Sequence, residues 1–377
     1  MRNPFLISGY RSPSYFCNRK METKRIVSAI RNNRNLTLFS QRRLGKTGLL
    51  HHVFYILAKE KEFNLIYIDI FATKNLNQFV NEFAQGVFVG LTDKSKSIFD
   101  RVGKVFKFIK PSITYDPLTG APSINFNFNS EDETHSSLNT IFALLAKSKK
   151  SNVIVIDEFQ QVLNYPNKKM EALLRMHIQK SNNSTFIFSG SQKHLLLSMF
   201  GEYNRPFYQS SELMQLGKID KAEYKKFIHK KFQSNKINIE PEAIDFILEW
   251  TKDHTYYVQY VCNKLFSSAA NKITLDFAKH QCSLILEENE PLYLSYRNLL
   301  SSFQWELLKA IALEGEVIKI TSNDFILKYK LNSPSSVQRG IKSLIAKELI
   351  TFEDKKYFLQ DIFFSRWFGV KFNSQIK

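Results

Sequence analysis

The sequence contains few cysteines, and this scarcity limits the kinds of site it can build. Only three are present in 377 residues, at Cys17, Cys262 and Cys282, and they lie far apart. An odd number of widely separated cysteines forms neither a disulfide framework nor the paired spacing of a zinc site. We therefore expect a protein of a reducing, cytoplasmic compartment.

Long apolar runs are also missing. No run approaches the ~18 residues that a membrane-spanning helix needs. The opening stretch, MRNPFLISGYRSPSYF, has no sustained apolar region, so we expect neither a signal peptide nor a membrane partner. Apolar residues still make up 44% of the chain, with 33 phenylalanines, which predicts a large buried core rather than disorder.

Acidic residues are outnumbered by basic ones. The 35 Asp and Glu against 53 Lys and Arg give a formal net charge of +18, and most of the excess lies in the first 150 residues. One interpretation is an anionic partner, nucleic acid first of all. The other is a generally basic proteome with solvated lysines. Composition alone leaves both interpretations open.

A phosphate-binding pattern is present from residue 35 to residue 50, NLTLFSQRRLGKTGLL. Its apolar run predicts a strand, a polar turn leads to Gly45, Lys46 and Thr47, and a helical segment follows. Strand, loop, Gly-Lys-Thr and helix is the order of a P-loop. The backbone N–H groups of such a loop and the N-terminus of its helix hold phosphates.

The P-loop interpretation gives the loop residues specific roles. Lys46 would reach the β- and γ-phosphates, and the Thr47 hydroxyl would ligate Mg²⁺. Ser40 replaces the usual first glycine, which we interpret as a tolerated variant. Arg42 and Arg43 either add charge near the phosphates or face solvent. The expected ATP contacts are Ser40, Gln41, Arg42, Arg43, Leu44, Gly45, Lys46, Thr47 and Gly48.

A second pattern, NVIVIDEFQ at residues 152–160, predicts a buried parallel strand that ends in two carboxylates. Ligand-binding residues of an open α/β sheet follow the carboxyl ends of its strands. Asp157 would hold Mg²⁺ through water, and Glu158 would orient and deprotonate an attacking water. Ionised groups in a buried position need partners, which favours a functional role over a structural one.

A third apolar run, TFIFSGS at residues 185–191, also ends in polar residues. Ser189 or Ser191 would sense the γ-phosphate, and Ser191 is our ATP-contact candidate; a helix N-cap is the alternative role. No Asn-Lys-x-Asp guanine-recognition motif occurs, which favours ATP over GTP. The glutamate beside the Mg²⁺ aspartate favours water as the phosphoryl acceptor. The segment 15–22 would cover the adenine or form an ordinary surface helix.

The order of these elements predicts an α/β chain of three parts. A P-loop ATPase core at 1–212 would carry a basic helix at 94–110 and a β-hairpin insertion at about 111–130, where DPLTG is a strong turn signal. Four helical patterns predict a helical lid at 213–290. Pro291 would start a winged helix-turn-helix domain at 291–377, whose first helix would cover 297–313.

The third helix of that last domain, at 333–347, would present side chains to a DNA major groove. The candidate DNA contacts are Ser335, Ser336, Gln338, Arg339 and Lys342. Only two of them carry a full charge. A winged helix used for packing or for a protein partner is therefore an equally good interpretation.

The segments FSQRRLGKTGLL, VIVIDEFQ, FIFSGSQKHLLLSMF and RPFYQSSELMQLGKID together resemble the archaeal-type ATPases, AAA+-like P-loop NTPases of the STAND group that often end in a winged helix. The resemblance implies a parallel sheet with an Asp-Glu Walker B strand, ATP and Mg²⁺ as ligands, and ATP hydrolysis. It also implies that Arg19 lies near the nucleotide, although Asn18 and Lys20 replace the Gly and Glu of the family's Gly-Arg-Glu-like motif.

The resemblance also bears on assembly. The family often has Pro-Leu-Tyr-Gly-Arg where this chain reads PFYQS at 206–210, so the expected arginine is missing. Arg205 is the substitute candidate for an arginine finger in a homo-oligomer. The expected function is ATP hydrolysis that drives a conformational or assembly switch, acting on DNA. The alternative is a nucleotide-dependent switch with slow hydrolysis whose winged helix engages DNA or a protein.

Overall fold

The computed structural model describes residues 2–91, 111–115, 122–126, 130–167 and 169–372. The chain forms two compact units, Ser8–Ile219 and the combination of Met1–Ile7 with Asp220–Lys377. The predicted domain boundaries at 212 and 290 stay predictions. The predicted basic helix at 94–110 and the turn of the predicted hairpin lie outside the described residues.

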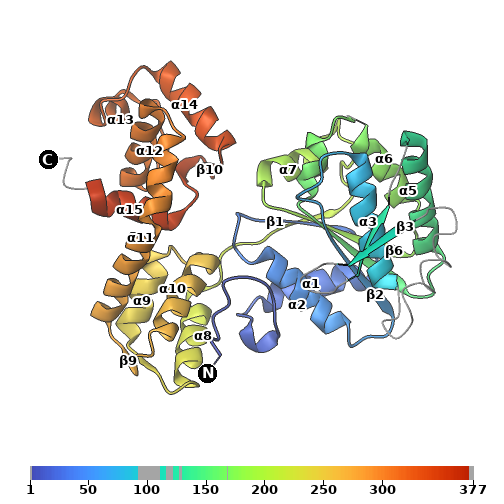
Figure 1. Ribbon diagram of the computed structural model, residues 1–377, viewed down its shortest axis with the longest axis horizontal. Coiled ribbons are helices and arrows are strands. Elements are labelled where there is room, and N and C mark those ends of the chain that lie inside the picture. The colour runs from blue at the N-terminus through green and yellow to red at the C-terminus, as the bar shows by residue number, and fades with distance from the viewer. Residues whose placement is uncertain (1, 92–110, 116–121, 127–129, 168, 373–377) are drawn as a thin grey trace. The chain divides into compact units, whose positions relative to one another are not determined.

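The first unit is built on a five-stranded parallel sheet in the order β2-β5-β6-β1-β7 (Figure 1). Strands β5 and β6 are buried along almost their whole length, as expected for central strands covered on both faces. The predicted α/β class with a parallel sheet is confirmed. The strands are β1 Leu36–Phe39, β2 Phe63–Asp69, β5 Ser151–Asp157, β6 Ser184–Gly190 and β7 Glu212–Gln215.

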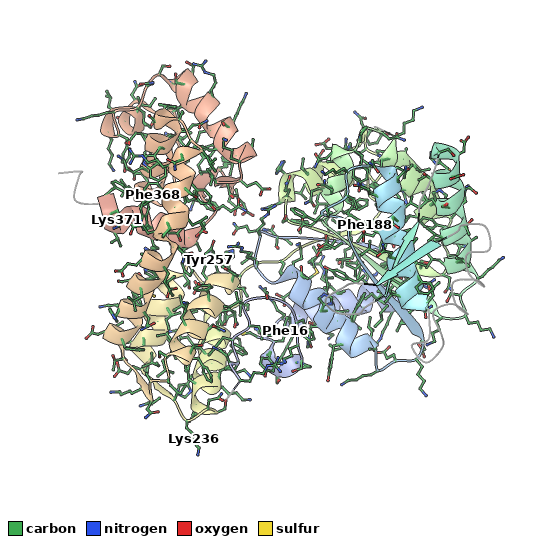
Figure 2. All side chains as sticks on the ribbon, viewed as in Figure 1. Phe16, Phe188, Lys236, Tyr257, Phe368 and Lys371 are labelled. Atoms are coloured by element: carbon green, nitrogen blue, oxygen red, sulfur yellow. The ribbon has the colours of Figure 1, made fainter. Side chains whose placement is uncertain are left out.

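Helices cover both faces of this sheet. One apolar cluster joins α1 and α2 to the sheet, and a second joins it to α3, α5, α6 and α7. Phe188 of β6 lies in the second cluster, where its ring centroid is 4.6 Å from that of Phe159 and 5.0 Å from that of Phe200 (Figure 2). The helices are α1 Lys20–Arg31, α2 Lys46–Leu57, α3 Leu76–Leu91, α5 Glu131–Ala146, α6 Met170–Gln179 and α7 Lys193–Gly201.

Short elements complete the unit. Strands β3 (Pro111–Tyr115) and β4 (Pro122–Phe126) pair antiparallel within the predicted insertion. The 3₁₀ helix η1 (Pro13–Tyr15) precedes α1, and η2 (Phe159–Asn164) follows β5. Strand β7 was not predicted, because it has only four residues and only Met214 among them is buried.

The second unit begins with four helices, α8 Lys221–Gln233, α9 Pro241–Trp250, α10 Thr255–Ser267 and α11 Leu275–Asn298, with the short strands β8 Asn238–Ile239 and β9 Lys272–Ile273. The start of the chain packs here. Phe5 is 1% exposed and its ring centroid lies 5.0 Å from that of Phe232. The Asn263 side-chain amide donates to the Phe5 carbonyl at 2.6 Å.

The domain boundary at Pro291 stays a prediction, but the predicted start of the next helix at residue 297 was wrong. Helix α11 continues through Pro291 to Asn298. Two residues further on, Tyr293 is buried and stacks on Phe364 at 4.7 Å, so tertiary packing offsets the cost of an interior proline. The helix break falls instead at Ser301, which forms a capping box with Gln304 and starts the next helix.

Three helices and a β-hairpin form the predicted winged helix. Positive φ angles of 50° at Asp354 and 64° at Lys355 are those that a two-residue hairpin turn requires. A final helix, α15, was not predicted; its Phe368 (Figure 2) packs 5.0 Å from Trp305 of α12. The elements are α12 Ser302–Glu314, α13 Asn323–Lys328, α14 Pro334–Ala346, β10 Ile350–Glu353, β11 Lys356–Leu359 and α15 Ile362–Phe372.

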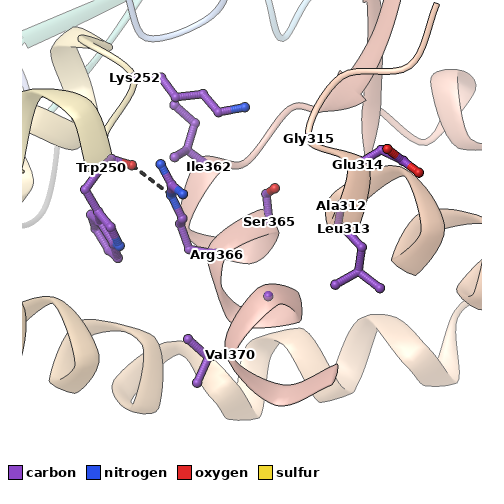
Figure 3. Close-up of a pocket in the computed structure, with 11 residues that line it drawn as sticks. Trp250, Lys252, Ala312, Leu313, Glu314, Gly315, Ile362, Ser365, Arg366 and Val370 are labelled. Atoms are coloured by element: carbon purple, nitrogen blue, oxygen red, sulfur yellow. Dashed lines mark hydrogen bonds between the residues drawn. The ribbon is translucent and has the colours of Figure 1, made fainter. Parts of the chain in front are cut away.

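A cavity of about 530 Å³ lies between α9, α12 and α15 (Figure 3). Arg366 on its wall donates from Nε to the Trp250 carbonyl at 3.0 Å and from Nη2 to the Glu249 carbonyl at 3.3 Å. The bond to Trp250 satisfies a carbonyl group at the C-terminus of α9, where intrahelical donors run out, and the Glu249 carbonyl also accepts from the Lys252 N–H at 3.1 Å. Over the ranges described, the structure contains no helix that is both long and apolar enough to span a bilayer.

Candidate functional site

Three strand ends bring the polar motifs of the sequence together. The P-loop follows β1, Asp157 ends β5, and the Ser189–Ser191 segment ends β6, which lies between the other two strands. Because the strands are parallel, their carboxyl ends meet at one edge of the sheet, where open α/β sheets bind ligands. The fold therefore places the predicted phosphate, metal and sensor residues at one edge.

The P-loop has the backbone that its sequence predicts. Gly45 has φ +96° and caps α2, a left-handed conformation that favours glycine. Helix α2 starts at Lys46, so its unpaired N–H groups face the loop. Lys46 is 7% exposed, and its Nζ lies 3.7 Å from both Asp157 Oδ1 and Glu158 Oε1. Ser40 is buried, and its hydroxyl donates to the Gln41 carbonyl.

Asp157 is the most heavily bonded acid of the site. Its Oδ2 accepts from the Thr47 hydroxyl at 3.1 Å and from the Tyr67 phenol at 2.5 Å. Burial by itself raises the pKa of Asp157. The charge of Lys46 and hydrogen bonds from Tyr67 and the Glu158 N–H outweigh that effect and hold the pKa below its usual value. Asp157 is therefore an anion at neutral pH.

The oxygens at this position suit Mg²⁺. Thr47 supplies a hydroxyl and Asp157 a carboxylate, and the two are already within hydrogen-bond distance of each other. Mg²⁺ prefers oxygen ligands, retains several waters and is usually bound by one or two protein groups plus phosphates. Within the described ranges, no group of three or more His, Cys, Asp or Glu side chains is placed to hold a metal ion. The Thr47 hydroxyl and the Asp157 carboxylate therefore fit a site in which Mg²⁺ takes its other ligands from a nucleotide and from waters.

Glu158 lies beside Asp157 in a left-handed backbone conformation, with φ 55°. Its Oε2 accepts from the Ser191 hydroxyl at 2.9 Å and from the Gln160 amide at 2.5 Å. Sequence reasoning named Ser191 as a phosphate sensor and did not identify Gln160. In the structure, Ser191 bonds directly to the carboxylate expected to act as the base.

Arg19 lies close to the P-loop, although it bonds to protein atoms there. It is 4% exposed and has φ 63°. Its Nη2 donates to the Leu44 carbonyl at 3.3 Å, and its Nη1 pairs with Glu22 at 2.9 Å. The side chain therefore braces the loop backbone on the side of α1.

An aromatic cluster that the sequence did not predict adjoins α2. Phe16 stacks on His52 with a centroid distance of 4.2 Å, and the Tyr10 hydroxyl bonds to His52 Nδ1 at 2.9 Å. Phe16 also lies near the start of α2, because a Cβ added to Gly48 would be 3.9 Å from its Cε2. The cluster contains part of the segment 15–22 expected to cover the adenine.

Other candidates lie away from these contacts. Arg205 pairs with Glu171 of α6, with Nη2 2.9 Å from Oε1. Gln338, Arg339 and Lys342 are exposed on α14, together with Ser335, whereas Ser336 is partly buried and accepts a long 3.5 Å hydrogen bond from Arg339. These α14 residues share one exposed face in the second unit.

Two residues of the site were missed by sequence reasoning. Tyr67 occupies an ordinary position in the apolar run of β2, and nothing local marks its bond to Asp157, 90 positions away. Gln160 had a usable signal, because it ends the DEFQ segment that follows the apolar run of β5.

Comparison with known proteins identifies the family. Residues 16–261 match the ATPase domain predominantly from Archaea, and residues 291–369 match a probable winged helix domain. No curated protein matches the chain. Among solved structures, a Walker-type ATPase of Pyrococcus abyssi has a TM-score of 0.65 and 17% identity, covering 97% of this chain and 99% of its own.

The structures of two ORC proteins from Aeropyrum pernix are also similar. ORC2, solved as ADPNP–ADP complexes, has a TM-score of 0.55 and 13% identity over 97% of this chain and 98% of its own. ORC1 in complex with DNA has a TM-score of 0.54 and 12% identity over 100% and 98%. At these identities the likeness concerns the fold. The match over residues 16–261, more than half of the chain, shows that the protein belongs to the family of ATPase domains found predominantly in Archaea.

Proposed function

We propose that this protein binds ATP with Mg²⁺ at the β1–β5–β6 edge and transfers the γ-phosphoryl group to water. The observation that carries the proposal is the contact of Thr47 with Asp157, beside Lys46 and Glu158. One hydroxyl, two carboxylates and one ammonium group meet within a few ångströms. Phosphoryl transfer to water needs this combination of charge and base.

Binding and orientation are assigned to the loop and to α2. The backbone N–H groups at the start of α2 would hold the phosphates, and Lys46 would move from its carboxylate partners to the β- and γ-phosphates. Thr47 and Asp157 would hold Mg²⁺, which supplies charge neutralisation at the phosphates. Phe16 and His52 would offer the adenine a stacking surface, since their rings already lie parallel.

Glu158 is assigned the role of general base. It would accept a proton from the attacking water as the oxygen–phosphorus bond forms and ADP leaves. Its neighbours suit this role, because Ser191 and Gln160 hold one carboxylate oxygen and would keep holding it when Lys46 moves to the phosphates. An adjacent base favours water over a small-molecule acceptor.

Two substitutions test this function. Lys46→Ala should abolish ATP binding, measured by calorimetry with Mg²⁺. Glu158→Gln should bind ATP with wild-type affinity while kcat falls by about 10²–10⁴-fold, the usual contribution of a general base. Glu158→Gln protein that hydrolysed ATP like the wild type would overturn the mechanism.

A second candidate function is a nucleotide-dependent switch with slow hydrolysis, in which the winged helix engages DNA or a protein. Its support is the exposed face of α14 formed by Ser335, Gln338, Arg339 and Lys342. The two functions differ in turnover. Steady-state ATPase rates with and without duplex DNA, together with particle size in ATP, separate the two functions. An ATPase of the first kind turns over many times. A switch retains its nucleotide and changes its affinity for a partner or its assembly state.

A further inference from the structure

The carboxylate of Glu158 is held asymmetrically. Its Oε2 accepts two hydrogen bonds, from Ser191 Oγ at 2.9 Å and from Gln160 Nε2 at 2.5 Å. Its Oε1 lies 3.7 Å from Lys46 Nζ. The oxygen with two donors is fixed by uncharged groups of the chain itself. The other oxygen faces the cation that the proposed function assigns to phosphate.

Gln160 is well placed to fix that orientation, because it is fixed itself. It is 4% exposed and belongs to η2, the 3₁₀ turn that follows β5 directly. A buried amide in a short turn has few rotamers available. Its hydrogen bond therefore restrains Glu158 more than a bond from a mobile surface side chain would.

Gly190 provides the space that Gln160 occupies. A Cβ built on Gly190 would lie 2.0 Å from Gln160 Oε1 and 2.8 Å from Leu196 Cδ1. Gly190 has no positive φ, so this close approach explains the absence of a side chain. Any larger residue would displace the Gln160 amide, and the bond to Glu158 would be lost with it.

We propose that Gln160, seated against Gly190, is a positioning residue that holds Glu158 Oε2 and so directs Oε1 toward the attacking water. The inference rests on the proposed function, in which Glu158 is the base. A general base works only within hydrogen-bond reach of the proton it takes, so a loosened carboxylate loses rate even when substrate binds normally. Gln160 touches neither substrate nor metal in this scheme.

The first test separates rate from binding. Gln160→Met keeps the length of the side chain and removes its donor, so kcat should fall by about 10–100-fold while KM and ATP affinity stay at wild-type values. Gln161→Met is the matched control, since the Gln161 amide donates to the Thr73 carbonyl instead and its loss should leave kcat unchanged. Equal kcat for Gln160→Met and wild type would overturn the inference.

The second test asks whether Gly190 acts through Gln160. Gly190→Ala should lower kcat as Gln160→Ala does, and the double variant should be no slower than Gln160→Ala alone. If the losses in kcat multiply in the double variant, Gly190 acts independently of Gln160. That result would overturn the claim that Gly190 acts by leaving space for the Gln160 amide. Ser191→Thr keeps the other donor and should retain most of the rate that Ser191→Ala loses.

A third measurement does not use turnover. In nucleotide-free protein, Gln160→Met and Glu158→Ala remove the same contact, so their effects on unfolding should be less than additive in a double-mutant cycle. If the two changes in unfolding free energy are strictly additive, Gln160 and Glu158 do not interact and the positioning role is contradicted. Wild-type protein without any ATPase activity would overturn the proposed function, whereas active wild type with a normal Gln160→Met rate overturns the positioning role alone.

Discussion

Tyr67 donates its phenolic hydrogen bond to Oδ2 of Asp157 at 2.5 Å, the same oxygen that accepts from Thr47. Burial and the charge of Asp157 raise the pKa of Tyr67 far above its usual value, so the phenol stays protonated and remains a donor. Tyr67 thereby fixes the carboxylate assigned to Mg²⁺. A donor behind a metal ligand typically contributes 10–100-fold to metal affinity or activity.

Tyr67→Phe should therefore raise the Mg²⁺ concentration needed for half-maximal ATPase activity by about tenfold. ATP binding measured without Mg²⁺ should be unchanged, because the phenol is bonded to the carboxylate. Tyr203→Phe is the control, since Tyr203 is 82% exposed. An unchanged Mg²⁺ requirement in Tyr67→Phe would remove this residue from the site.

The stability of the α/β unit should fall as pH drops from 7 to 5. Burial lowers the pKa of His51, His52 and His177, in His51 against a smaller opposing effect of Asp157. The unfolded chain, with histidine pKa values near ~6.5, then binds more protons than the folded one. This stability is present above pH ~6.5 and declines below it. Chemical denaturation at several pH values measures the decline, and replacing all three histidines by Gln should flatten it.

The Arg205–Glu171 ion pair should contribute to stability. Glu171 is largely buried and Arg205 partly exposed, so Arg205→Ala or Glu171→Ala should each cost about 1–3 kcal/mol in unfolding free energy. The proposed arginine-finger role predicts a loss of ATPase rate in addition to this loss of stability. A finger is worth 10³-fold or more in kcat, so Arg205→Ala should lose that factor while Glu171→Ala does not. Equal kcat losses in the two variants would contradict the finger.

Duplex DNA binding through α14 should depend on salt. If Arg339 and Lys342 contact phosphates, each alanine variant should reduce the slope of log affinity against log salt by about 1. Lys328→Ala serves as the control, because Lys328 of α13 is paired with Glu314 at 2.5 Å. Affinity that does not change between low and moderate salt would favour a protein partner for this helix.

Arg366 should stabilise the second unit by capping α9. Arg366→Met leaves the Trp250 carbonyl without its donor, whereas the Glu249 carbonyl keeps its bond from the Lys252 N–H. The loss should lower the unfolding free energy by about 1–3 kcal/mol. Lys371→Met removes only an exposed ion pair with Glu290 and should cost less than about 1 kcal/mol. Thermal unfolding of the two variants compares them directly.

Local patterns in the sequence were sufficient for much of the fold. The apolar runs of β1, β5 and β6 and the Ser333-Pro334 start of α14 each carry their own signal, and the structure has all of them. Strand β7 carries almost none, since a short edge strand with a single buried residue resembles a loop. Pro291 gave a misleading signal, because the packing of Tyr293 that keeps α11 intact comes from residues about 70 positions away.

The residues of the site also divide into those with a local sequence signal and those without one. Lys46, Thr47, Asp157 and Glu158 are recognisable because each follows a strand in a motif with known chemistry. Tyr67 supports Asp157 from 90 positions away and becomes its neighbour only when the sheet forms, whereas Gln160 lies two residues from Glu158 and contacts it only because of its side-chain direction. Supporting contacts of this kind depend on register and on side-chain direction, which local patterns do not specify.

The packing of the N-terminal residues also bears on the order of events during synthesis. Phe5 leaves the ribosome before the whole α/β unit, yet the amide that bonds its carbonyl belongs to Asn263, 258 positions later. Its ring contacts are also with late residues, Phe232 before Asn263 and Phe266 after it. The α/β unit is thus complete in the nascent chain while the first segment still lacks its binding site. Each doubling of loop length adds only about 0.6 kcal/mol to the entropic cost of closure, so this late joining costs about 3 kcal/mol more than closing a loop of ~10 residues.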